Sequence, residues 1–312
     1  MTPRTLMVSA CSNVYFDDWM DMLDSVEALG LRESFDCGLI DLGLTPEQVE
    51  RVAARGVRRV QGEWLFEPPR DKRELHYIGF GGKPFLPVYF PGYEMYLWMD
   101  ADTWAQTPEF WHRVRDGALR DGASFPYEVD ADYEPVAWHL YRWLAGNTWL
   151  GTGRIGTALR VARAPITNHG IFAMRGDNPL WAEWQQLMAQ MVGRAQKIVA
   201  FDQLSLAVLL FERRRPWDGP EATYNWCCQR AIPAWDPARG LFVTPGPSHR
   251  VIHALHLTNF TRGRMLTLRR TDGTPFEGNL HPAGGLMDRA LRPGAAGPAV
   301  APSAAPAHAL AD

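Results

Sequence analysis

Short apolar runs alternate with amphipathic segments along the first third of the chain. Runs at residues 6–10, 36–42, 57–60 and 95–99 have the length of strands, and apolar residues between the first two recur at helical spacing. The run at 95–99 is apolar throughout, which is typical of a strand buried on both faces of a sheet. The repeated order strand, helix, strand predicts an α/β fold, with a mixed, mostly parallel central sheet flanked by helices.

Local signals predict where individual elements begin and end. Thr45, Pro46 and Gln48 form the pattern of a capping box, at the start of a helix that ends near Arg55. Residues 83–90 predict a short aromatic helix, whereas residues 145–165, rich in glycine and threonine, predict no element. The remaining expected elements are a helix from Thr107, a strand at 123–126, a helix at 134–144, a strand at 171–174, helices at 178–196 and 202–211, a late strand at 251–257 and a hairpin turn at 271–274.

Length and composition limit the function classes. The chain has 312 residues, 46% of them apolar, which suits one large domain over 1–292, followed by an Ala/Pro/Gly-rich tail at 293–312 that we expect to be disordered. The net charge of −3 gives no electrostatic case for binding nucleic acid or an anionic membrane. Four cysteines without metal-ligand spacing favour a reducing cytosol. The sequence shows neither a signal peptide nor a membrane-spanning stretch, and its many Arg, Ala, Gly and Pro residues indicate a bacterial composition.

Two carboxylates follow the buried strand at 95–99. Asp100 and Asp102 are alternate residues, so on an extended chain they point the same way. Their mutual repulsion favours a cation between them, and the carboxyl ends of strands are where open α/β sheets bind ligands. The pair therefore predicts a site for Mn²⁺ or Mg²⁺. A solvated acidic turn after a core strand remains the alternative.

Several enzyme classes use such carboxylates. Asp and His ligands also build metal phosphohydrolases and nucleotidyltransferases. A hydrolase would carry further Asp/His clusters for a second metal, and none is convincing here. A nucleotidyltransferase would have a glycine-rich, basic loop after its first strand, and the turn from Cys11 to Val14 is not such a loop. The aromatic residues from Trp138 to Trp143 are compatible with either core packing or an acceptor groove.

An ordered set of short motifs resembles a known family. Asn13 and Tyr15 follow the first strand, Asp100 and Asp102 follow the central one, and three further motifs come later: Asn168-His169-Gly170, Asp202-Gln203 and His253. Over roughly residues 5–260 this order resembles the GT-A nucleotide-sugar glycosyltransferases, nearest to the glycogenin and bacterial galactosyltransferase group.

The resemblance implies a Rossmann-like GT-A fold that binds a nucleoside-diphosphate sugar, usually UDP-linked. It implies a nucleotide-binding part at about 1–106, an acceptor-side part at about 107–262 and a C-terminal extension at 263–292. It implies transfer of a hexose with retention of its anomeric configuration. The acceptor would be a hydroxyl group of a glycan, a lipid-linked molecule or a protein. The expected location is the cytoplasm or the periphery of a membrane. The implied metal ligands, for Mn²⁺ or Mg²⁺, are Asp100, Asp102 and His253; the implied donor-sugar residues are Asn168, Asp202 and Gln203; and the implied nucleotide residues are Tyr15, Asn13 and Asp41. Apart from the resemblance, Lys83 is a candidate that could reach a phosphate of the nucleotide, although a lone lysine usually lies on the surface.

The sequence departs from the family pattern after the metal histidine. In the family, a glycine follows that histidine after three residues and a phosphate-binding lysine after six. Counted from His253, these positions hold His256 and Asn259. Arg262 or Arg264 could supply the missing charge, because a guanidinium binds phosphate well. A catalytically degenerate domain that only binds a nucleotide sugar or a glycan therefore remains an alternative.

Overall fold

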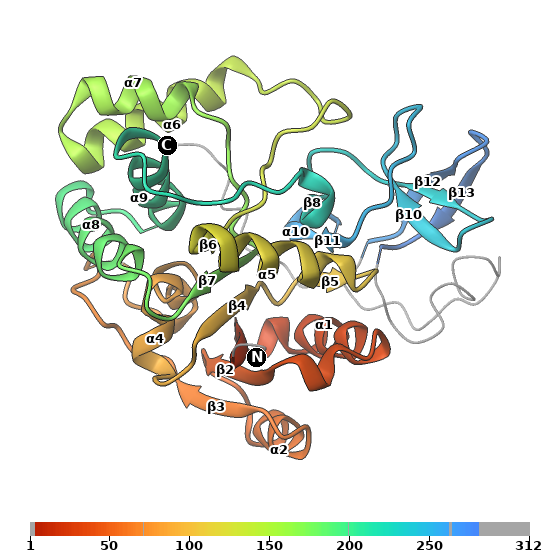
Figure 1. Cartoon of the computed structure of the whole chain (residues 1–312), viewed down its shortest axis with the longest axis horizontal. Coiled ribbons are helices and arrows are strands. Elements are labelled where there is room, and N and C mark those ends of the chain that lie inside the picture. Colours follow the sequence, from red (N-terminus) through yellow and green to blue (C-terminus); the bar gives the residue numbers. More distant parts are fainter. Residues whose placement is uncertain (1–3, 71, 199, 262–263, 281–312) are drawn as a thin grey trace.

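A computed structural model describes residues 4–70, 72–198, 200–261 and 264–280, and it is built on a central six-stranded sheet. The strand order is β3-β2-β1-β4-β7-β6 (Figure 1). The first four run parallel, and β7 is antiparallel to both β4 and β6. This arrangement confirms the predicted mixed, mostly parallel α/β fold. The strands are β1 (Thr5–Cys11), β2 (Asp36–Asp41), β3 (Arg58–Gln61), β4 (Met95–Met99), β6 (Ala123–Ser124) and β7 (Ile171–Arg175).

One face of the sheet packs against three helices, α1 (Phe16–Ala28), α2 (Pro46–Ala54) and α5 (Glu109–Asp121). Alternate strand residues, such as Met7, Leu39 and Leu97, point into this layer because successive side chains of a strand face opposite ways. The predicted capping box of α2 is confirmed. The Gln48 backbone N–H donates to Thr45 Oγ1 at 3.3 Å, and the Thr45 N–H donates back to Gln48 Oε1 at 3.0 Å.

The other face packs against the segment after β3 and two later helices. The intervening strand residues, including Leu6, Tyr96 and Trp98, lie in this second layer. It contains α3 (Ile78–Gly81), α4 (Leu86–Tyr89), α8 (Leu180–Ala195) and α9 (Phe201–Ala207), which continues into a π-helical turn, η5 (Val208–Glu212). Short 3₁₀ helices complete the chain here and elsewhere: η1 (Asn13–Tyr15), η2 (Leu31–Ser34), η3 (Leu75–Tyr77), η4 (Lys83–Phe85) and η6 (Ala222–Tyr224).

Two helices cover residues 138–163. The first confirms part of the helix expected at 134–144 and continues into the region at 145–165, for which the sequence predicts no element, and the second lies within that region. They are α6 (Trp138–Thr152) and α7 (Ile155–Arg163), which pack against each other as a hairpin. The glycines misled the prediction because one of them serves packing: a Cβ on Gly151 would lie 2.7 Å from the Phe201 ring. Glycine therefore allows α6 to approach α9 closely. The core-packing alternative for Trp138 is wrong, since this side chain is 73% exposed.

The C-terminal third adds two small sheets that share a core around Trp226 and Trp235. The hairpin turn at 271–274 is confirmed, with the Thr274 N–H donating to Asp272 Oδ1 at 2.8 Å. The strand expected at 251–257 is shorter, and the tail at 293–312 lies outside the described residues. The two sheets are β5-β11-β8 and β10-β9-β12-β13, formed by β5 (Thr103–Ala105), β8 (Trp226–Cys227), β9 (Ala234–Asp236), β10 (Leu241–Val243), β11 (Ala254–His256), β12 (Leu266–Arg270) and β13 (Pro275–Gly278); α10 (Thr258–Thr261) follows β11.

Candidate metal and nucleotide-sugar site

The two carboxylates lie where β4 leaves the sheet. The Asp100 N–H donates to the Gly170 carbonyl at 2.7 Å, so this residue stays tied to the segment before β7. Its side chain is oriented by Trp98, whose Nε1–H donates to Asp100 Oδ1 at 2.7 Å. The Asp102 carbonyl accepts the Leu257 N–H at 2.9 Å. Segments from the middle and from the C-terminal third of the chain thus hold the Asp-x-Asp turn in place.

His256 is the histidine that lies beside these carboxylates. In the antiparallel pairing of β5 and β11, His256 is opposite Thr103, the residue directly after Asp102. Its Nε2 lies 3.4 Å from Asp102 Oδ1 and 3.8 Å from Asp100 Oδ2. One ligand atom from each of the three side chains lies within 4.8 Å of the others. Two carboxylate oxygens and one imidazole nitrogen form a donor set that suits Mn²⁺-type ions.

The structure corrects the choice of His253. Its ring stacks on Tyr224 at a centroid distance of 4.5 Å, and its Nδ1 lies 2.8 Å from Thr107 Oγ1. In the register of β5 and β11, His253 precedes the pair Ala254–Ala105 and so lies beyond the far end of β5 from Asp102. Because the two histidines are three residues apart on extended backbone, they also point to opposite faces.

Lys83 lies behind the carboxylate pair. Its Nζ is 3.0 Å from Asp100 Oδ1, donates to the His169 carbonyl at 3.1 Å and lies 3.8 Å from Asp202 Oδ2. Burial alone would lower the pKa of Lys83, but Asp100 and Asp202 outweigh it and raise that pKa. The result is an ammonium held between two carboxylates, and its burial excludes the surface position that is usual for a lone lysine.

Asp202 comes to the same cluster from the start of α9. Its side chain is 4% exposed, and its Oδ1 is buried without a hydrogen-bond partner among the described residues. Burial raises the pKa of Asp202, and the charge of Lys83 acts against that rise. Gln203 lies next to it but faces Thr167, with Nε2 at 3.5 Å from the Thr167 carbonyl. A helix cap needs a carboxylate oxygen only to accept backbone N–H groups. The buried Asp202 Oδ1, which has no hydrogen-bond partner among the described residues and lies beside an ammonium, therefore indicates a role beyond capping.

The Asn168-His169-Gly170 motif forms the wall beside His256. Asn168 Oδ1 accepts the Gly170 N–H at 2.9 Å, which fixes the turn before β7. A Cβ on Gly170 would lie 2.6 Å from His256 Nδ1, so only glycine leaves room for that ring. Burial and the nearby Lys83 hold the pKa of His169 well below its usual value, so this ring is neutral. The motif shapes the site through its backbone and its small size.

The predicted nucleoside residues line the same edge of the sheet. Asn13 and Tyr15 follow the carboxyl end of β1, and Asp41 ends β2 beside it, opposite Cys11. Asp41 is buried and already engaged, because Oδ1 accepts the N–H groups of Gly43 and Leu44 while Oδ2 pairs with Arg59 at 2.6 Å. Its carboxylate therefore orders the loop after β2.

Glu128 is a half-buried carboxylate in the loop after β6 that belongs to none of the sequence motifs. Burial raises its pKa, and the charges of Arg230 and His256 act against the rise. Glu128 thus lies within electrostatic reach of the metal histidine candidate. A lone glutamate in a loop has no sequence signature, so only the fold could reveal this proximity.

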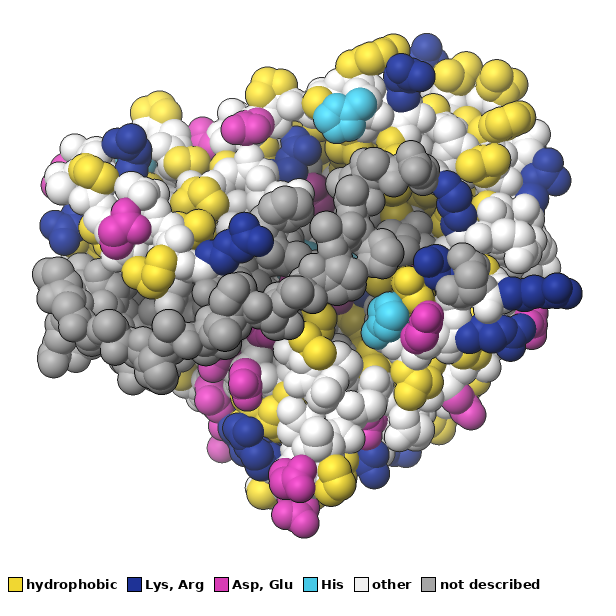
Figure 2. Space-filling model, turned by 180° about the vertical axis from the view of Figure 1, so that it is seen from behind, with side chains coloured by type: hydrophobic (Ala, Val, Ile, Leu, Met, Phe, Trp, Pro, Cys, Tyr) yellow, Lys and Arg dark blue, Asp and Glu magenta, His cyan; other side chains and the backbone are white. Residues whose placement is uncertain are grey.

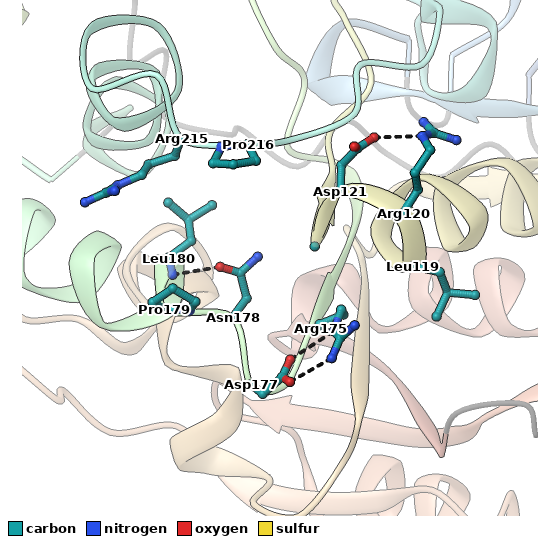
Figure 3. A pocket seen from close by; sticks show the side chains of 11 residues that line it. Leu119, Arg120, Asp121, Arg175, Asp177, Asn178, Pro179, Leu180, Arg215 and Pro216 are labelled. Carbon is teal, nitrogen blue, oxygen red and sulfur yellow. Dashed lines mark hydrogen bonds and ion pairs between the residues drawn. The ribbon is translucent and has the colours of Figure 1, made fainter.

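A separate surface hollow lies at the opposite end of β7 (Figure 3). Arg175, at that end, pairs with β4 at Met95, whereas Ile171 pairs with Met99 next to the Asp-x-Asp turn. The arginines of the hollow are engaged: Arg175 pairs with Asp177 at 2.7 Å, Arg120 with Asp121 at 2.9 Å and Arg215 with Glu183 at 2.7 Å. This hollow therefore does not contribute to the carboxylate site.

Comparisons with known proteins find similarity in solved structures alone. No model of a protein family matches the chain, and neither does any curated protein sequence. The galactosyltransferase LgtC, solved with donor and acceptor sugar analogs, matches with 14% identity and a TM-score of 0.48 over 82% of this chain and 88% of that chain. The bifunctional glycosyltransferase WbbM matches with 11% identity and a TM-score of 0.49 over 73% of this chain and 40% of that chain. The glycosyltransferase GlyE of Streptococcus pneumoniae matches with 12% identity and a TM-score of 0.44 over 72% of this chain and 47% of that chain.

The last two matches are to longer chains, of which this chain spans less than half. All three are named as glycosyltransferases, the class that the ordered sequence motifs resemble. The chain's own topology gives a mixed α/β fold, with an Asp-Asp-His group at the carboxyl end of its central strand.

Proposed function

We propose that this protein is a metal-dependent glycosyltransferase, which transfers a hexose from a nucleoside-diphosphate sugar to an acceptor hydroxyl. The nucleotide that we propose for this donor is UDP. The observation that carries the proposal is the convergence of Asp100, Asp102 and His256 at the carboxyl end of β4. Two segments remote in sequence meet there with the donor set of a divalent cation site. A solvated acidic turn would not need a histidine brought from the other end of the chain.

Glycosyl transfer requires that negative charge be stabilised on the departing diphosphate. A bound Mn²⁺ or Mg²⁺ would supply that stabilisation as a Lewis acid, held by Asp100, Asp102 and His256. Lys83 fixes the position of Asp100 from behind and keeps a positive charge next to the carboxylates. Trp98 orients the same carboxylate through its indole N–H. These contacts hold the ligands ready before the donor binds.

The donor sugar and the nucleoside would lie on either side of this centre. Asp202 offers a free carboxylate oxygen near Lys83, which suits a hydroxyl of the sugar, and Asn168 and Gln203 come from the adjoining segments. Asn13, Tyr15 and Asp41 lie along the sheet edge toward β1 and β2, on the nucleoside side. Ligands of open α/β sheets bind along this carboxyl edge.

The choice of His256 also removes one departure from the family pattern. Counted from His256, the residues three and six positions later are Asn259 and Arg262. Asparagine tolerates left-handed backbone better than most residues, and arginine provides the phosphate-binding charge. Arg262 lies outside the described residues, so its role rests on this spacing. Retention of the anomeric configuration and a glycan, lipid-linked or protein acceptor form part of the same proposal.

A thermal-shift screen of nucleotide sugars, with and without Mn²⁺, tests the proposal. A ligand that binds the native state raises the melting temperature, so a UDP-sugar should stabilise the protein only when Mn²⁺ is present. The screen is followed by a donor hydrolysis assay with the same sugar. Asp102→Asn should abolish both effects, whereas Asp177→Asn, in the separate hollow at the other end of β7, should leave both unchanged. Stabilisation without hydrolysis in the wild type would favour a degenerate binding domain, and no metal-dependent stabilisation would refute the proposal.

A further inference from the structure

We propose that the outer face of the α6–α7 hairpin, hereafter the hairpin face, docks on an anionic phospholipid bilayer. This inference does not depend on the proposed transfer reaction. The hairpin face exposes an unusual set of large apolar side chains. Trp138 is 73% exposed, Trp149 52% and Ile155 70%. The same face includes the exposed residues Tyr141, Leu150 and Leu159.

The exposed positions follow the helical repeat, so each helix presents one continuous stripe. In α7, Ile155, Leu159 and Arg163 are four residues apart, while Thr157, Ala158 and Val161 are buried. In Figure 2, yellow hydrophobic and dark blue basic side chains lie together at the upper right edge. This is the place of α6 and α7, which lie at the upper left of Figure 1, because the two views differ by a rotation of 180° about the vertical axis. Clusters of exposed apolar side chains mark interaction sites.

The charge of this region identifies the kind of partner. Between Glu134 and the end of α7 the sequence has no acidic residue and four arginines: Arg142, Arg154, Arg160 and Arg163. The net charge of −3 for the whole chain hides this local excess, which is why composition alone gives no case for an anionic membrane. Two arginines, Arg154 and Arg160, share the carboxylate of Glu212 at 4.0 Å and 3.9 Å. Arg142 and Arg163 are exposed and form no ion pair with any described residue.

Tryptophan and tyrosine next to arginine suit the boundary between lipid headgroups and acyl chains. Indole and phenol rings combine an apolar body with a polar edge, and arginine binds lipid phosphates. Helices of this kind lie in the plane of the interface. No helix among the described residues is long and apolar enough to cross a membrane. A hydrophobic protein partner would not require four arginines on a hairpin whose own sequence has no acidic residue.

The hairpin is rigidly joined to the candidate site. Gly151 of α6 packs against Phe201, and Asp202, the next residue, is part of the carboxylate cluster. Docking of the hairpin face would therefore hold the site at a fixed height above the lipid surface.

Flotation of the full chain with lipid vesicles tests the inference. Vesicles of 70% phosphatidylcholine and 30% phosphatidylglycerol are compared with pure phosphatidylcholine, at low and high salt. We expect binding to the anionic vesicles that weakens as salt screens the charges. The double variant Arg142→Glu/Arg163→Glu should reduce the partition coefficient at least about 25-fold, since each basic residue near an anionic surface contributes roughly fivefold.

The apolar part of the face is tested by Trp138→Ser/Ile155→Ser, which should weaken partition about tenfold or more because apolar side chains no longer enter the interface. Matched controls lie elsewhere on the surface. Leu119→Ser/Met265→Ser removes exposed apolar residues, and Arg51→Glu/Arg70→Glu reverses exposed charges; both should bind vesicles like the wild type. Near-ultraviolet circular dichroism confirms that each variant is folded.

The inference would be overturned if the variants and their controls lost vesicle binding to the same extent. It would also be overturned if the wild type bound neutral and anionic vesicles equally. Sedimentation velocity provides a further outcome. A dimer that disappears in Trp138→Ser/Ile155→Ser, together with no vesicle binding, would show that a second copy of the chain covers this face instead of lipid.

Discussion

Replacing Lys83 by methionine tests whether the buried charge cluster behaves as the structure requires. Methionine keeps most of the length and volume of the side chain but removes the ammonium. In the wild type this group lies 3.8 Å from Asp202 and 3.0 Å from Asp100, and the side chain is only 6% exposed. Without it, the carboxylate of Asp202 stays buried and loses its only cationic partner among the described residues.

The expected cost follows from the distance. A unit charge pair about 4 Å apart interacts by about 4 kcal/mol at an effective dielectric constant of 20. Breaking a buried pair by removing one partner typically costs roughly 3–5 kcal/mol, which agrees with that figure. Asp100 is partly exposed, so water compensates for the loss on that side. We therefore expect Lys83→Met to lower the free energy of unfolding by about 3 kcal/mol.

Urea unfolding, followed by both tryptophan fluorescence and far-ultraviolet circular dichroism, measures this change. A double-mutant cycle with Asp202→Asn separates charge from packing. Since the neutral amide does not need the ammonium, Lys83→Met should cost at least about 1 kcal/mol less in the Asp202→Asn background. A loss below about 1 kcal/mol in the wild-type background, or an equal loss in both backgrounds, would refute the reasoning.

Three further predictions concern the surroundings of the site. Gly170→Ala should weaken Mn²⁺ binding about tenfold, because its Cβ would displace the His256 ring, while Gly146→Ala, with open space around it, should not. Isothermal titration measures the Mn²⁺ affinity of both variants, and equal affinities would contradict this prediction. His169 is neutral when folded but protonates below its ordinary pKa of 6.5 when unfolded, so the wild type should lose about 1.4 kcal/mol more than His169→Gln between pH 7.5 and pH 5.5, and parallel urea midpoints would contradict this. Arg262→Gln should weaken UDP binding about tenfold in fluorescence titrations without changing Mn²⁺ affinity, and an unchanged UDP affinity would exclude the proposed phosphate contact.

The fold was predictable because its signals are local. The alternation of strands and helices up to β4 follows from hydrophobic periodicity, and the capping box of α2 follows from the residue types Thr45 and Gln48. The second half of α6 and all of α7 were missed because Gly151 serves a contact between helices, and composition cannot distinguish such a glycine from one in a loop. Strands of two or three residues, such as β8 and β9, are too short to show periodicity.

The site was predictable in its carboxylates but not in its histidine. Asp100 and Asp102 are fixed by the strand that precedes them, so their placement requires only local reasoning. The choice between His253 and His256 depends on the register between β5 and β11, which are about 150 residues apart in sequence and become neighbours only in the folded chain. Likewise, the meeting of Lys83 with Asp202 depends on how α9 packs behind the sheet.

A titration of Mn²⁺ in the presence of UDP, for the wild type, His256→Ala and His253→Ala, tests the metal centre most directly. The structure predicts that His256→Ala loses at least about tenfold in Mn²⁺ affinity, whereas His253→Ala binds the ion like the wild type and is only less stable. A defect confined to His253→Ala, or UDP binding that EDTA leaves unchanged in the wild type, would contradict the proposed site.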